Sequence, residues 1–310
     1  MHMYRWDLDR TYLDTDIHSV RSMIRAAFET ASEKRNIPGS GALLRGLMAF
    51  DPQCRVGIVS GSPTQLRSVL EEKLHLDGVR FESLVLKDHI GNLKRGRLRA
   101  VYGQLGYKLP ALLKQRQGLG PAIRETCFGD DTEVDAVVYS LYADALAGRI
   151  DAATMGRVMA RGDAYPDAIE LATKALRKVG TADVVDDIFI HVDRGIPIRQ
   201  FRLLGPRVIP VFSWLQAALV LFNRKRLGAD GIADVIESVP NANGDTVASW
   251  FQDAVRRGLV QADEMLDLVR EHERLKVYEP TIDRAFARMG RVVVAKGRQT
   301  PDYLAYLDQL

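Results

Sequence analysis

Asp7-Leu8-Asp9-Arg10-Thr11 follows directly on Met3-Tyr4-Arg5-Trp6, an apolar run that predicts a short buried strand. The side chains of the two acids at the strand end are expected to lie close together. The repulsion between their charges costs free energy unless a cation neutralises them. A hard divalent ion such as Mg²⁺ suits such a place, because it takes oxygen ligands and keeps several waters. One carboxylate could then attack a phosphorus atom while the other moves protons. The motif is short, so its interpretation depends on three further segments.

The second segment is Val56-Gly57-Ile58-Val59-Ser60-Gly61-Ser62-Pro63, a largely β-branched run that ends in hydroxyl groups. It predicts a buried strand, with Ser62 as the N-cap and Pro63 as the first residue of a following helix. A phosphate would meet hydroxyls, backbone N–H groups and the positive end of a helix there. Ser60 and Gly61 are therefore the candidates for binding phosphoryl oxygens.

Two later segments add a lysine and a second group of acids. Lys108 stands at the start of Lys108-Leu109-Pro110-Ala111-Leu112-Leu113, which predicts a helix. Cys127-Phe128-Gly129-Asp130-Asp131-Thr132-Glu133-Val134-Asp135 predicts another strand, which breaks at its glycine into acids and is followed by a helix. Ligands of parallel sheets bind beyond the carboxyl ends of the strands. The acid pair, the serine and Asp130 all follow predicted strands, so we expect them to lie at one edge of a sheet.

Together the four segments resemble the haloacid dehalogenase superfamily of phosphohydrolases, in their order and local context over roughly residues 1–148. Within this superfamily, Ser60-Gly61-Ser62-Pro63 and the segment from Gly129 to Asp135, with the later Tyr139, look like the catalytic domain of the actin-patch phosphatidate phosphatases. The chain departs from that pattern twice. Members usually carry a second Asp where it has Arg10, and often a Ser where it has Asp131.

The resemblance implies a role for each acid of the motifs. Asp7 is the nucleophile that becomes an aspartyl phosphate. Asp9 protonates the leaving oxygen, later activates water, and helps to hold the metal through its backbone carbonyl. Asp130 is a further ligand of Mg²⁺. Asp131 and Asp135 are additional metal candidates, of which one binds at or behind the metal and the other is an acid favoured at a helix N-terminus.

The remaining candidates leave alternatives open. Lys108 is expected to neutralise charge on the phosphoryl group and on the nucleophile, with Lys87 and Lys94 as competitors for that role. Thr11 is assigned to the phosphate site, where its side chain is expected to fix the loop after the first strand. Arg10 could reach a second acidic group on the substrate, or point away to a carboxylate of the chain itself.

Strand and helix patterns alternate through the first half of the chain. Strands are expected over 3–7, 55–60, 83–87 and 125–129, and helices over 63–74 and 133–147, with two more helices around 17–28 and 43–48. This alternation predicts an α/β fold with a doubly wound, mostly parallel, Rossmann-like sheet. About 45 residues separate the first acid pair from the strand that ends in Ser60, and about 48 separate Ser60 from Lys108, so neither gap fits a large inserted cap of ~100 residues. The site should then be open to a large or surface-bound substrate, unless the C-terminal half covers it.

From about residue 150 the pattern becomes mainly helical, which divides the chain into a catalytic domain over 1–150 and a helical region of unassigned role over 151–310. Helices are expected near 151–161, 166–179, 213–226, 230–238, 245–257, 262–276 and 280–289, and 187–192 could add a strand. The most apolar stretch, 208–222, is shorter than the ~20 residues that a bilayer needs. A buried helix is therefore expected there, with docking on lipid as the alternative.

Composition excludes several classes of protein. The chain has 310 residues and a formal net charge of +3, with basic residues interspersed among acids, which does not favour nucleic-acid binding. Its two cysteines, Cys54 and Cys127, are expected as buried free thiols. The histidines lack the spacing of zinc ligands. No signal peptide or transmembrane segment precedes the first motif, which predicts a cytoplasmic protein, while the oligomeric state stays open.

These observations predict a Mg²⁺-dependent phosphohydrolase that acts on a phosphomonoester through an aspartyl phosphate. The resemblance implies a phosphatidate-like lipid as its substrate. A phosphotransferase that uses the same aspartyl phosphate is one alternative, and phosphate release in water without an acceptor separates the two. A catalytically silent interaction protein is the other alternative. All four motif positions hold competent residues, which favours an enzyme.

Overall fold

The computed structural model describes residues 1–15, 29–88, 103–290 and 300–310. Its contacts divide the chain into two compact units, each assembled from segments that are distant in the sequence. Unit 1 contains Met1–Arg35, Arg55–Pro210 and Gly297–Leu310, and unit 2 contains Asn36–Cys54 and Val211–Lys296. A single boundary at residue 150 does not coincide with this division, because the sheet continues beyond that residue and a segment before the second strand joins the later helices.

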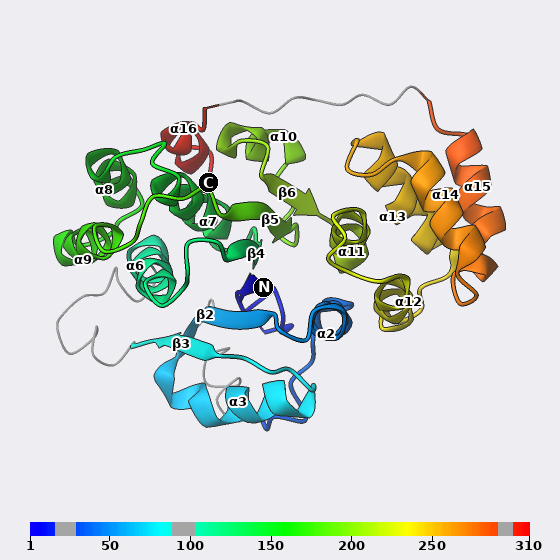
Figure 1. The fold of residues 1–310 in the computed structure, drawn as a ribbon, viewed down its shortest axis with the longest axis horizontal. Coiled ribbons are helices and arrows are strands. Elements are labelled where there is room, and N and C mark those ends of the chain that lie inside the picture. The colour runs from blue at the N-terminus through cyan, green and yellow to red at the C-terminus, as the bar shows by residue number, and fades with distance from the viewer. Residues whose placement is uncertain (16–28, 89–102, 291–299) are drawn as a thin grey trace. The chain divides into compact units, whose positions relative to one another are not determined.

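Unit 1 is built on a six-stranded sheet with the order β3-β2-β1-β4-β5-β6 (Figure 1). The strands are β1 (His2–Trp6), β2 (Arg55–Pro63), β3 (Ser83–Lys87), β4 (Arg124–Asp130), β5 (Val185–His191) and β6 (Val208–Val211). The ladders β1·β2, β1·β4, β2·β3 and β4·β5 are all parallel. The predicted α/β class with a Rossmann-like parallel sheet is therefore confirmed.

The central strand β1 places the first acid motif. It lies between β2 and β4, and all five of its residues are buried. Trp6 stacks on Phe128 of β4 with ring centroids 4.1 Å apart, and Phe128 stacks on Phe189 of β5. The amide of Asp7 then donates to the Phe128 carbonyl at 3.0 Å. This bond brings the carboxyl ends of β1 and β4, and the acids that follow them, side by side.

Helices of unit 1 connect and cover the strands. They are η1 (Thr64–Leu66), α3 (Arg67–Leu76), α6 (Leu105–Arg116), α7 (Asp135–Leu146), α8 (Ala152–Arg161), α9 (Pro166–Leu176), α10 (Ile198–Phe201), η2 (Arg202–Leu204) and α16 (Tyr303–Leu307). Helices α6 and α7 pack against the sheet, and α8 and α9 pack on them. Every residue of α7 is buried, which fits its apolar sequence on all sides.

The end of β2 differs from the predicted strand-to-helix junction. The strand continues through Pro63, and α3 begins only at Arg67 after the short turn η1, so Ser62 is not a helix N-cap. Both cysteines are free thiols, as expected, but Cys54 is only partly buried whereas Cys127 is fully buried. The helix expected around residues 17–28 lies outside the described residues.

The apolar stretch 208–222 does not form one helix. Its first residues form β6, and the helix α11 (Trp214–Asn223) begins after Ser213, whose side chain accepts a hydrogen bond from the Leu215 amide as an N-cap. Pro210 is accommodated because a proline is tolerated in an edge strand, and the helix begins where the Ser213 side chain caps it. In the sheet, β6 is an edge strand.

Unit 2 is helical. It contains α2 (Ser40–Phe50), α11, α12 (Ala229–Glu237), α13 (Gly244–Arg256), α14 (Ala262–Glu271), η3 (Lys276–Tyr278) and α15 (Glu279–Ala287). Helix α2 packs against α11 and α12, and α13 packs against α11 and α15. A Cβ at Gly46 would lie 2.9 Å from Leu227 Cδ1 and 3.3 Å from Gly231 Cα, so this glycine allows α2 and α12 to approach closely. Within the described ranges, no helix combines the length and apolar character that crossing a bilayer requires.

Candidate active site

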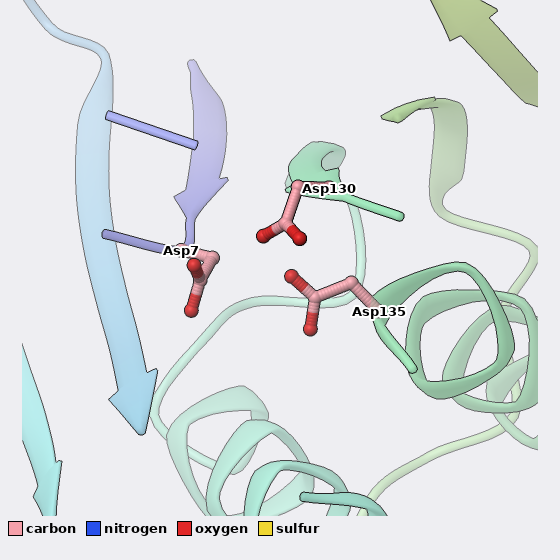
Figure 2. A group of neighbouring side chains, drawn as sticks. All are labelled: Asp7, Asp130 and Asp135. Carbon is pink, nitrogen blue, oxygen red and sulfur yellow. The ribbon is translucent and has the colours of Figure 1, made fainter. Parts of the chain in front are cut away.

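Three buried aspartates lie together where β1 and β4 end (Figure 2). Asp7 follows β1, Asp130 ends β4 and Asp135 begins α7. One carboxylate oxygen of each residue lies within 4.8 Å of those of the other two. Gly129 makes room for this approach, because a Cβ there would lie 2.6 Å from the Asp135 side chain. The sequence between β4 and α7 thus folds its first and last acids into one cluster.

Lys108 brings a positive charge to this cluster from α6. Its Nζ donates to Asp7 Oδ1 at 2.7 Å, to Glu133 Oε2 at 2.7 Å and to Asp135 Oδ1 at 2.5 Å. Burial opposes the charged ammonium, but these three carboxylates outweigh it and raise the pKa of Lys108 well above its ordinary value. Lys108 therefore stays protonated and contacts the predicted nucleophile as a cation.

The carboxylates of the cluster outnumber this one cation, and the pKa values of the three aspartates are raised. Burial, reinforced by the neighbouring acids, raises the pKa of Asp130 to about 8. Burial also raises the pKa of Asp135 to about 6, although Lys108 opposes the shift. For Asp7, burial again outweighs Lys108 and raises the pKa well above its ordinary value. Full ionisation of the cluster near neutral pH therefore requires a further cation.

Two oxygen atoms of the cluster are placed to bind such a cation. Asp7 Oδ2 and Asp135 Oδ2 are buried and have no hydrogen-bond partner among the described residues. Asp130, in contrast, accepts from the Thr11 hydroxyl at 3.0 Å and from the Thr132 amide at 2.6 Å. A buried oxygen without a partner is costly, and a set made only of carboxylate oxygens suits Mg²⁺. The residues present therefore fit a hard divalent cation.

Asp9 does not join the aspartate cluster. Its Oδ1 accepts from the Thr15 hydroxyl at 2.6 Å, and its Oδ2 accepts from the hydroxyls of Ser60 at 2.9 Å and Ser62 at 2.7 Å. The Ser60 oxygen also accepts from the Ser62 amide at 3.0 Å. The hydroxyl groups at the end of β2 thus hold the second acid of the first motif, and they lie next to it rather than at a helix N-terminus.

Gln104 and Glu133 are site residues that the sequence analysis did not assign. Gln104 Nε2 donates to Glu133 Oε1 at 2.7 Å. Its amide also lies against Gly61, where a Cβ would be 2.5 Å from Gln104 Nε2. Gln104 precedes Lys108 by four residues, so both side chains lie on one face of α6. That spacing could have identified Gln104, and Glu133 stood within the fourth motif.

Asp131 turns away from the aspartate cluster. Its Oδ1 accepts from the amides of Asp193 and Arg194, both at 2.7 Å, and its Oδ2 accepts from the Ile196 amide at 2.9 Å. These three amides belong to the loop that follows β5. Both carboxylate oxygens are therefore engaged with backbone, and Asp131 supports the site by holding this loop.

Arg10 follows the second of its two alternatives. Its Nε and Nη2 donate to Asp193 Oδ2, the former at 3.0 Å, and its Nη1 donates to Asp14 Oδ1 at 2.8 Å. The guanidinium thus binds carboxylates of the chain itself. The two departures from the family pattern, Arg10 and Asp131, both bind Asp193.

The structure also separates the lysines that compete with Lys108. Lys87 Nζ donates to the Gly103 carbonyl at 2.7 Å, and burial lowers its pKa to about 8. Lys94 lies outside the described residues. Of the two described lysines, Lys108 is the one whose ammonium contacts Asp7.

Comparison with known families found a similarity, which lies in the first half of the chain. Residues 6–155 match the family model described as "Phosphatidate phosphatase APP1, catalytic domain". The match spans all four motifs and ends within α8. Searches of curated proteins and of solved structures returned no match.

Proposed function

We propose, from the match of residues 6–155 to this family model, that the chain is a Mg²⁺-dependent phosphomonoester hydrolase that works through an aspartyl phosphate. The observation that carries the proposal is the buried cluster of Asp7, Asp130 and Asp135 with Lys108 bound to it. A phosphorylated lipid of the phosphatidate kind is the substrate that the family favours.

The cation has a defined place in this proposal. Asp7, Asp130 and Asp135 would hold Mg²⁺, which supplies positive charge to the phosphoryl oxygens when bound. The carboxylate of Asp7 attacks phosphorus, so that a bond forms from its oxygen and the bond to the leaving alcohol breaks. Lys108 offsets the negative charge that develops near Asp7.

Asp9 moves the protons in both half-reactions. It gives a proton to the departing alcohol oxygen, and then takes one from the water that attacks the phosphorus of the aspartyl phosphate. That second step releases inorganic phosphate and regenerates the Asp7 carboxylate. Because Asp9 is held by the hydroxyls of Thr15, Ser60 and Ser62, it must exchange one of these partners for the leaving oxygen.

A phosphotransferase would use the same first half-reaction and pass the phosphoryl group to an acceptor alcohol instead of water. The buried cluster supports both activities equally, so the acceptor is what separates them. A silent interaction protein is less well supported for two reasons. Lys108 already contacts Asp7, and the three aspartates lie close enough together to bind one metal ion.

The test is phosphate release from a panel of phosphomonoesters, including phosphatidate in mixed micelles, with and without Mg²⁺. Wild type is compared with Asp7→Asn and with Asp186→Asn, which removes an acid that pairs with Arg124 at the opposite end of the sheet. We expect Mg²⁺-dependent release that survives Asp186→Asn and is lost in Asp7→Asn. Covalent labelling of the wild type from a radioactive phosphoryl donor, cleaved by hydroxylamine, would report the aspartyl phosphate. No release above the Asp7→Asn background from any ester would reject a phosphohydrolase.

A further inference from the structure

We propose that Arg10 is a positioning residue for Asp9, and that it acts through Asp193 in the loop after β5. The inference rests on the proposed function, because it assigns to Asp9 the transfer of a proton to the leaving group. Arg10 itself touches neither substrate nor metal in this scheme. It fixes the backbone on which Asp9 stands.

The backbone of Arg10 has an unusual conformation. Its φ is 60°, in the left-handed region that side chains other than glycine, asparagine and aspartate seldom adopt. An arginine has no short polar side chain to stabilise this conformation locally. A residue of this kind persists only where its surroundings hold it, and such residues gather at functional sites.

The conformation of Arg10 shapes the turn that follows Asp9. The amides of Thr11, Tyr12 and Leu13 all donate to the Leu8 carbonyl, at 3.3, 2.9 and 2.8 Å, and the Arg10 amide donates to the Leu13 carbonyl at 2.9 Å. Arg10 therefore closes a tight turn immediately after Asp9. A change of φ at this position would reorient the Asp9 backbone relative to the site.

The side chain of Arg10 provides the external hold. Its Nε and Nη2 both donate to Asp193 Oδ2, and its Nη1 donates to Asp14 Oδ1. Two carboxylates thus enclose one guanidinium, and charged donors and acceptors make the stronger hydrogen bonds. The arginine and Asp193 are each 26% exposed at the side chain, so the pair is partly shielded from solvent.

The backbone of Asp193 is itself held by hydrogen bonds to the fourth motif. Its amide donates to Asp131 Oδ1, and the same carboxylate also binds the amides of 194 and 196. Asp131 follows directly on Asp130 of the aspartate cluster. A continuous series of contacts therefore runs from Asp9 through Arg10, Asp193 and Asp131 to Asp130, and it links the two acid motifs of the site.

A leaving-group comparison tests this role. An alkyl phosphate needs a proton on its departing oxygen, whereas p-nitrophenyl phosphate releases p-nitrophenolate, a stable anion that needs little help from an acid. We expect Arg10→Ala to lower kcat on the alkyl ester by about tenfold, and on the nitrophenyl ester by less than about threefold. Arg124→Ala is the matched control, since it removes a similar arginine–aspartate pair between β4 and β5 at the other end of the sheet.

Two further variants separate the side chain from the backbone. Asp193→Asn keeps the shape of the anchor but removes its charge, and should give the same leaving-group dependence with a smaller loss. Arg10→Asn accepts the left-handed conformation but cannot reach Asp193, so it should still lose activity on the alkyl ester. Full activity of Arg10→Asn on that ester, or equal losses on both esters in Arg10→Ala, would overturn the proposal.

Hydrogen exchange keeps the test independent of turnover. The amides of residues 193, 194 and 196 and those of the turn 11–13 should exchange faster in Arg10→Ala than in Arg124→Ala. If the wild type releases no phosphate from either ester, the proposed function fails, and faster exchange would still support the contact series. Unchanged exchange at both segments would reject it, whatever the activity.

Discussion

The two ends of the sheet in unit 1 each bury a cluster of charged residues, and the same four elements, β1, β4, α6 and α7, supply both. At the amino end Glu125 accepts from Arg5 at 2.7 Å, from Arg116 at 3.0 Å and from the Tyr142 hydroxyl at 3.0 Å. Both oxygens of this one acid are bonded. At the carboxyl end the acids exceed the cation, and Asp7 and Asp135 each keep a buried oxygen without a described partner.

A structural cluster of buried charges can be told from a functional one by how fully its polar atoms are paired. Burial alone does not distinguish them, because Glu125 and Asp7 are both 0% exposed. The two clusters differ in how many of their buried carboxylate oxygens have a hydrogen-bond partner. At the amino end Arg5 Nη2 has no hydrogen-bond partner among the described residues, but it belongs to a cation beside an acid whose two oxygens are already bonded. At the carboxyl end the unpartnered atoms are acceptors in a region of excess negative charge, which is what a metal or a phosphoryl group can use.

Substitution of one acid at each end gives the largest contrast. Asp7→Asn should lower phosphate release on the order of a thousandfold or more, because the nucleophile is lost. It should not lower the melting temperature, since it removes a charge from an acid-rich cluster. Steady-state kinetics and a thermal melt of the same sample measure both. Activity close to wild type in Asp7→Asn would contradict a catalytic role for the cluster at the carboxyl end.

Glu125→Ala should give the opposite pattern. It leaves Arg5 and Arg116 buried without their acid, which should cost about 3–5 kcal/mol of unfolding free energy. Activity per folded molecule should remain. Urea denaturation measures the cost, and Glu82→Ala is the control, because its pair with Arg55 is partly exposed and should be worth at most about 1 kcal/mol. A cost for Glu125→Ala no larger than that of Glu82→Ala would contradict a structural role.

The excess of acid at the carboxyl end should appear as a pH dependence of the metal-free protein. The folded-state pKa of Asp130 is about 8 and that of Asp135 is about 6, both above the ordinary value of 3.8, so the folded state binds more protons between these values. Their contribution to stability is therefore present below pH 4 and is lost as pH rises to 8. Since one pKa unit corresponds to about 1.4 kcal/mol, the shift of Asp130 alone predicts a loss of several kcal/mol.

Melting with a chelator at pH 5 and pH 8 measures this loss, and Asp130→Asn isolates it from other titrating groups. Mg²⁺ should restore more stability at pH 8 than at pH 5, because protons compete with the ion for the same oxygens. Equal stabilisation by Mg²⁺ at the two pH values would argue that the ion binds elsewhere.

Glu133→Gln should have the smallest effect. The amide retains the volume of Glu133 and can still accept from Lys108, but it removes one carboxylate from the excess. Because Glu133 acts behind the reacting groups, we expect kcat to fall by about tenfold, the lower end of losses seen for such supporting residues. The measurement is kcat for Glu133→Gln, and the control is kcat for Glu82→Gln. A loss as large as that of Asp7→Asn would place Glu133 among the reacting groups.

Local patterns in the sequence predicted most of the elements. Strands at 3–7, 83–87 and 125–129 appear with shifts of a residue or less, and each of the seven helices expected beyond residue 150 has a counterpart from α8 to α15. Hydrophobic period and turn residues act over a few positions, so a single sequence carries them. The apolar run 208–222 misled because its composition did not reveal that a strand ends at Val211 and that a helix begins only after Ser213.

Side-chain partners were harder to predict than elements. Asp130 and Asp131 are adjacent and chemically identical, yet one faces the cluster and the other binds amides some sixty positions later in the chain. The union of α2 with the helices after 211 is likewise a long-range choice. These contacts depend on which groups from distant parts of the chain lie nearby in the fold, so a local sequence pattern does not predict them.

The segments of the two units alternate along the chain, so the chain passes four times from one unit to the other. A protease that cuts any single passage would leave the units joined covalently through the remaining ones. A cut near residue 35 would produce a short N-terminal fragment that contains β1. This fragment would stay attached, because β1 is hydrogen-bonded to both β2 and β4. A nicked molecule should therefore migrate as one species under native conditions and separate only in denaturant.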